Sequence, residues 1–131
     1  MIRAERLNEI SGEIVDAAIQ VHSEMGPGLL ESVYEVLLEH ELQSRGLKVF
    51  RQLAFPIVYR GMRFNEGYRL DLLVEDCVIV EIKSVEEISP VHKKQVLTYL
   101  RLNKKPLGLL LNFNTNLMKD GIVRLANQAP E

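Results

Sequence analysis

The sequence has very little of several features that would define a function at once. It contains a single cysteine, Cys77, which cannot form an internal disulfide and has no second cysteine nearby for metal or redox chemistry, so we expect it to be structural. No run approaches the roughly 20 apolar residues of a membrane span, and no apolar stretch or cleavage site follows the charged start of the chain. The three histidines lack metal-site spacing. We therefore expect a cytoplasmic protein without a membrane partner.

An excess of positive charge is missing as well. The chain has 16 basic and 18 acidic residues and a net charge of −2, which disfavours strong non-specific binding to nucleic acid, because that affinity comes mainly from Lys and Arg. Binding is still open, since divalent cations in an acidic site would cancel part of the negative charge. A length of 131 residues, ordinary composition, and no repeats or linkers predict one domain over residues 1–131.

The first third of the chain has the periodicity of helices. Apolar residues at helical spacing predict a helix over residues 7–25, which Gly26-Pro27-Gly28 ends. A second helix is predicted over residues 29–45, and Gly46 closes it, as expected where a C-terminus favours a left-handed residue.

The pattern then changes to short runs rich in Val, Ile, Phe and Tyr, which predict strands. These runs cover residues 47–52, 55–59, 68–74 and 78–83, with turns predicted at Arg60-Gly61 and Asn65-Glu66-Gly67.

The part of the chain after residue 88 predicts a helix followed by a buried strand. Ser89-Pro90 begins a helix that continues to Asn103. The continuous apolar run 107–111 is typical of a strand buried on both faces, reached by a parallel crossover. The tail 117–126 is compatible with either strand or helix. The order α-α-β-β-β-α-β predicts a mixed α/β fold with a central mixed sheet flanked by helices.

Three polar residues in the strand region are candidates for a catalytic site. Glu81 and Lys83 share one face of their strand. If Glu75-Asp76-Cys77 forms a three-residue turn, Asp71 lies directly opposite Glu81, whereas a two-residue turn would separate them. Two adjacent carboxylates attract Mg²⁺ or Mn²⁺, and a nearby lysine can orient a water or stabilise charge on a phosphate. The alternative is a solvated strand face with an ordinary Glu–Lys pair.

The same stretch resembles the core motif of the PD-(D/E)XK nuclease superfamily, an Asp on one strand and Glu-x-Lys on the next, although Leu70 stands where a proline often precedes the Asp. Residues 28–34, Gly-Leu-Leu-Glu-Ser-Val-Tyr, resemble the signature of the GxxExxY protein family, a branch assigned to that superfamily. The similarity covers nearly the whole chain. It implies a restriction-endonuclease-like core and a metal-dependent nuclease that uses Mg²⁺ or Mn²⁺ and acts on nucleic acid, on DNA in preference to RNA.

The resemblance also implies roles for particular residues. Metal would be held by Asp71, Glu81, the backbone carbonyl of Ile82, and Glu31, while Lys83 positions the attacking water. Glu31 shares a helical stripe with apolar residues, which turns it inward, although a glutamate at a helix N-terminus is also favoured by the helix dipole alone. On the later helix, the resemblance gives Gln95 a contact with the site or the substrate.

Further residues of that helix are candidates for substrate contact. Tyr99 lies one turn after Gln95, on a helix that we expect to bury Val96, Leu97 and Leu100. Lys94 and Arg101 belong to a basic stripe that could meet phosphates or could simply be solvated, and its members are Lys94, Thr98, Arg101 and Lys105. A catalytically idle nuclease-fold binding module, such as a regulatory dimer, is the main alternative function. A hydrolase of a small phosphorylated ligand is a weaker one. An apolar strand edge is compatible with a homodimer, and neither substrate nor cleavage specificity follows from the sequence.

Overall fold

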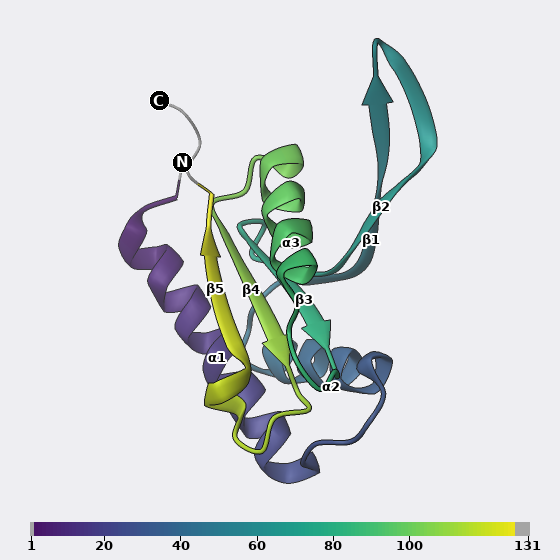
Figure 1. Ribbon diagram of the computed structural model, residues 1–131. Coiled ribbons are helices and arrows are strands. Elements are labelled where there is room, and N and C mark those ends of the chain that lie inside the picture. Colours follow the sequence, from purple (N-terminus) through teal and green to yellow (C-terminus); the bar gives the residue numbers. More distant parts are fainter. Residues whose placement is uncertain (1, 128–131) are drawn as a thin grey trace.

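The computed structural model describes residues 2–127, which fold around one five-stranded sheet with the strand order β1-β2-β3-β4-β5 (Figure 1). The helices are α1 (Ala4–Met25), α2 (Glu31–Ser44) and α3 (Pro90–Asn103). The strands are β1 (Val49–Tyr59), β2 (Met62–Val74), β3 (Val78–Lys83), β4 (Leu107–Asn112) and β5 (Ile122–Ala126), and a short 3₁₀ helix, η1 (Met118–Gly121), precedes β5. The predicted mixed α/β fold with a mixed sheet and flanking helices is confirmed.

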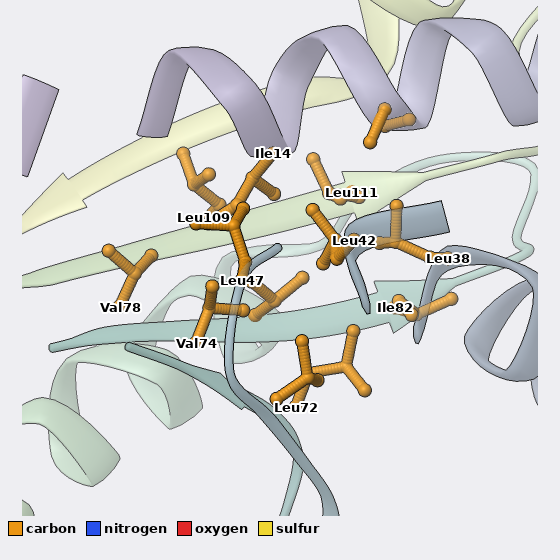
Figure 2. Packing of buried hydrophobic residues seen from close by; sticks show 14 of the residues in the cluster. Ile14, Leu38, Leu42, Leu47, Leu72, Val74, Val78, Ile82, Leu109 and Leu111 are labelled. Carbon is orange, nitrogen blue, oxygen red and sulfur yellow. The ribbon is translucent and has the colours of Figure 1, made fainter. Parts of the chain in front are cut away.

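The sheet has a hydrophobic core on each face. Buried residues of α1 and α2 pack against one face of β2, β3 and β4, and Figure 2 shows Ile14, Leu38 and Leu42 meeting the strand residues there. On the other face, Val96 and Leu100 of α3 pack against Ile79 and Leu110. Successive side chains of a strand point to opposite faces of the sheet. Because both faces are covered by a core, every residue of β4 is buried, as its continuous apolar run predicted.

The β2–β3 hairpin has the predicted register. Val74 pairs with Val78 and Leu72 with Val80, so Glu75-Asp76-Cys77 is a three-residue turn. Glu75 and Asp76 both adopt positive φ, which lets the chain reverse this tightly, and the Cys77 amide donates to the carbonyl of Val74. Cys77 is buried, as expected for a structural residue.

The β3-α3-β4 segment forms the predicted parallel crossover. β3 and β4 pair in parallel from Val78↔Leu107 to Lys83↔Asn112. The first turn of α3 is capped as expected, because the Ser89 amide donates to Nδ1 of His92 at 3.1 Å. The tail, which the sequence left open, forms η1 and then β5, antiparallel to β4. No helix within residues 2–127 has the length and apolar character to cross a membrane.

The β1–β2 hairpin is longer than predicted. The predicted runs 47–52 and 55–59 are joined in one strand that begins at Val49. The predicted turn at Asn65-Glu66-Gly67 is wrong, because β2 continues through these residues. The register shifts between Phe55 and Ile57, which makes this segment a bulge. A Cβ atom on Gly67 would collide with the carbonyl of Phe55, so the glycine permits close backbone approach at the bulge.

Candidate active site

The three candidate residues meet where β2 and β3 separate. The pair of this hairpin farthest from the turn is Leu72↔Val80, and Asp71 and Glu81 are the next residues along the two strands. Val80 and Ile82 point into the core beneath α1 and α2. Strand alternation therefore places Glu81 and Lys83 on the opposite face, which α3 partly covers. The structure thus brings Asp71 and Glu81 together, as the predicted turn requires.

Side chains link the two strands at this point. The Asp71 backbone N–H donates to Oε2 of Glu81 at 2.8 Å, and the Ile82 backbone N–H donates to Oδ2 of Asp71 at 2.8 Å. These two charge-assisted bonds hold each carboxylate in a fixed position on the partner strand. In this arrangement the backbone N–H of Ile82 binds the Asp71 carboxylate, whereas the expected metal ligand is the backbone carbonyl of Ile82.

Burial makes both carboxylates difficult to ionise. Glu81 is only 4% exposed, and its pKa is raised to about 8, first by desolvation and then by the charge of Asp71. Desolvation also raises the pKa of the half-buried Asp71, with smaller contributions from nearby Glu35 and Glu31. The ammonium group of Lys83 lowers the pKa of both carboxyls. Lys83 is therefore close enough to act electrostatically on the pair.

Glu31 reaches the end of β3 from the start of α2. Its Oε2 accepts a hydrogen bond from the Ser84 backbone N–H at 3.0 Å, and the Ser84 hydroxyl donates to the carbonyl of Leu29 at 2.9 Å. The hydroxyl of buried Tyr34 donates to Gly26 O at 2.6 Å and accepts from Leu29 N–H at 3.1 Å. These bonds fix the turn before α2, so the inward orientation predicted for Glu31 is found.

Glu35 is a further carboxylate that the sequence analysis did not assign. It lies one turn after Glu31, is 4% exposed, and raises the pKa of both Asp71 and Glu81. Gln52 Nε2 donates to its Oε1 at 2.7 Å, and Arg51 forms an ion pair with the same oxygen at 3.3 Å. The i, i+4 spacing from Glu31 was a sequence signal for this position.

The predicted contacts from α3 differ in their proximity to the carboxylates. Tyr99 is half-buried, and its pKa is raised by desolvation and then by the charges of Glu81 and Asp71, whereas a hydrogen bond with Gln95 lowers it. Tyr99 and Gln95 therefore border the site. Lys94 and Arg101 are exposed on the helix, and within residues 2–127 neither forms an ion pair with the carboxylates.

Two details of the α3 prediction need correction. Leu97, expected to be buried with its neighbours, is 42% exposed, because the helix rests on the sheet through Val96 and Leu100. Lys105, counted in the basic stripe, forms an ion pair with Asp76 at 3.0 Å. The stripe is therefore reduced at its C-terminal end.

The chemistry of the donor set fits a hard divalent cation. Across residues 2–127, no three His, Cys, Asp or Glu side chains are grouped closely enough to hold an ion as they stand. Backbone N–H groups engage the carboxylates of Asp71, Glu81 and Glu31, which holds them in their present positions. All the donors are nevertheless carboxylate oxygens, which Mg²⁺ and Mn²⁺ prefer, and their mutual repulsion is what a cation would offset.

Comparison with known proteins identifies a family. The family model described as PD-(D/E)XK nuclease superfamily matches residues 8–125, a range that includes every candidate residue named above. No curated protein and no solved structure matches the chain.

Proposed function

Because the chain belongs to the PD-(D/E)XK nuclease superfamily, we propose that it is a metal-dependent nuclease that hydrolyses phosphodiester bonds in nucleic acid. The observation that carries this proposal is the pair of neighbouring carboxylates, half-buried Asp71 and buried Glu81. Each accepts a backbone N–H of the other strand, and the Lys83 ammonium acts electrostatically on both. Buried acidic groups with raised pKa values are typical of functional sites. DNA is the preferred substrate in this proposal, and the nuclease domain spans residues 1–131.

The metal ligands in this proposal are Asp71, Glu81, Glu31 and the carbonyl of Ile82, with Mg²⁺ or Mn²⁺ as the ion. Members of this superfamily generally use divalent metals, and the all-oxygen donor set supports the assignment. When bound, the ion supplies Lewis-acid polarisation of the scissile phosphate. The pattern of residues 28–34, which places Glu31 beside Ser84, supports membership in the GxxExxY branch.

The side chains of the chain itself would orient the reaction. In hydrolysis, a water oxygen bonds to phosphorus while one ester P–O bond breaks, and the leaving oxygen gains a proton. Lys83 donates a hydrogen bond to the attacking water or to a phosphate oxygen, where it stabilises developing negative charge. Gln95 and Tyr99 border the carboxylates and position the phosphate, and exposed Lys94 and Arg101 contact flanking phosphates.

A second candidate is a nuclease-fold binding module without turnover, such as a regulatory dimer. The observation in its favour is that backbone N–H groups already hydrogen-bond the three proposed carboxylate ligands. A site stabilised in this way does not require an ion to keep its fold. The two candidates differ in whether the protein cleaves any nucleic acid.

A cleavage assay with matched variants tests the proposal. The protein is incubated with single- and double-stranded DNA and RNA in Mg²⁺, in Mn²⁺ or in chelator, beside Asp71→Asn, Lys83→Ala and Lys119→Ala. Lys119 is exposed on η1, outside the proposed site, so its variant controls for the loss of a positive charge. We expect metal-dependent cleavage that Lys83→Ala lowers about 100-fold or more and that Lys119→Ala retains. Cleavage that persists in chelator or in both site variants would contradict the proposal, and no cleavage of any substrate supports the binding module.

A further inference from the structure

The outer part of the β1–β2 hairpin projects away from the rest of the molecule (Figure 1). We call residues 55–69 the arm. Its two strands pair with each other up to Tyr59↔Met62, and the bulge between Phe55 and Ile57 lies at the base of the arm, near the part of β2 that carries Asp71. The arm thus begins at the candidate active site and ends at the Arg60-Gly61 tip.

Positive charge is concentrated on the arm, although the whole chain has a net charge of −2. The arm contains Arg60, Arg63 and Arg69 but only one acidic residue, Glu66. All three arginines are exposed, and among the described residues none of them forms an ion pair within 4.0 Å. This segment therefore complements an anionic partner better than the chain as a whole does.

The tip also exposes large apolar side chains. Val58, Tyr59 and Met62 are 67%, 60% and 64% exposed, and the Arg60 guanidinium lies 5.3 Å from the centre of the Tyr59 ring. An isolated two-stranded ribbon is marginally stable in water. Exposed apolar and cationic groups at the end of such a ribbon are groups that a bound partner can cover.

We propose that the arm lies along a groove of duplex nucleic acid beside the bond to be cut, with Arg60 and Arg63 against its phosphates. This inference rests on the proposed nuclease function. A two-stranded β-ribbon fits the major groove of B-DNA, and arginine is well suited to bind phosphate. Arg63 stands eight positions before Asp71 in the sequence, so at about 3.3 Å per residue the arm reaches roughly 25 Å from the site. At about 3.4 Å per base pair, that is about seven base pairs of duplex.

Binding to labelled duplexes tests this inference. Fluorescence anisotropy is measured in Mg²⁺ on an Asp71→Asn background, which prevents cleavage, for duplexes of 8 and 24 base pairs across a salt series. Arg60→Gln/Arg63→Gln is compared with Arg3→Gln/Lys119→Gln, which removes the same charge from exposed positions outside the arm. Circular dichroism checks that both variants fold, and light scattering gives their oligomeric state.

We expect the arm variant to bind the 24-base-pair duplex on the order of tenfold more weakly at physiological salt and to lower the slope of log K against log salt by about 2, because about two phosphate contacts are lost. The gain in affinity from 8 to 24 base pairs should shrink in the arm variant and persist in the control. Equal binding by both variants would overturn the inference, as would a wild-type dimer that the arm variant converts to monomers, since the arm would then contact a second copy. Both outcomes concern binding by Asp71→Asn proteins. Cleavage of the 8-base-pair duplex by protein that retains Asp71 is measured separately and tests the proposed function on its own.

Discussion

Replacing Glu81 with glutamine should stabilise the metal-free protein at neutral and alkaline pH. Burial and the charge of Asp71 raise the pKa of Glu81 from its ordinary 4.5 to about 8. A carboxyl whose pKa is higher in the folded state binds more protons when folded, so its contribution to stability is full below about pH 4.5 and is lost as the pH rises toward 8. Glutamine resembles the protonated form, and its carbonyl oxygen can still accept the Asp71 N–H.

The size of this effect follows from the pKa. One pKa unit corresponds to about 1.4 kcal/mol, and because Asp71 and Glu81 titrate as a pair we expect a gain of a few kcal/mol for the variant at pH 8. Thermal unfolding in chelator at pH 5 and pH 8 measures it. The midpoints of wild type and Glu81→Gln should be close at pH 5 and differ by several degrees at pH 8.

The matched control is Glu86→Gln, which removes one carboxylate from an exposed position in the loop after β3. It should leave the pH dependence of the midpoint unchanged. Adding Mg²⁺ should raise the midpoint of wild type more than that of Glu81→Gln, because an ion that binds only the folded state stabilises it. If Glu81→Gln in chelator is no more stable than wild type at pH 8, the account of Glu81 as a destabilising buried charge is refuted.

Three other substitutions test the surroundings of the site. Tyr34→Phe removes the hydroxyl that bonds Gly26 and Leu29, and we expect a loss of about 1–3 kcal/mol in urea unfolding, whereas an unchanged midpoint would mean that this turn needs no anchor. Glu35→Gln removes an acidic neighbour of Asp71 and Glu81. It should lower the pKa of Asp71, which NMR titration in chelator measures, and an unchanged Asp71 titration would contradict its placement. Leu100→Ala opens the core beneath α3 and should cost about 2–5 kcal/mol, and a cost below 1 kcal/mol would be inconsistent with its complete burial.

The sequence predicted the parts of the fold that depend on local pattern. The two apolar strands separated by only Glu75-Asp76-Cys77 predicted a tight hairpin but left a two-residue turn open. The three-residue turn that brings Asp71 to Glu81 was the register that the proposed site required, and the structure has it. The parallel β3-α3-β4 crossover likewise followed from a capped helix before the apolar run of β4.

Features that depend on tertiary contacts were missed. Gly67 was interpreted as part of a turn, but it serves the close approach of β2 to the Phe55 carbonyl at a bulge, which the dipeptide pattern does not reveal. The burial of Glu35 depends on Gln52, which adopts positive φ on β1 and reaches across to α2. The tail became β5 because the outer edge of β4 was available for pairing.

Anomalous diffraction from crystals of the wild-type protein soaked in Mn²⁺ tests the central claim most directly. We expect a manganese peak between Asp71 and Glu81, with Glu31 among the ligands and no such peak in Asp71→Asn crystals. A wild-type crystal at saturating Mn²⁺ with no peak beside these carboxylates, or a peak that Asp71→Asn leaves unchanged, would contradict it.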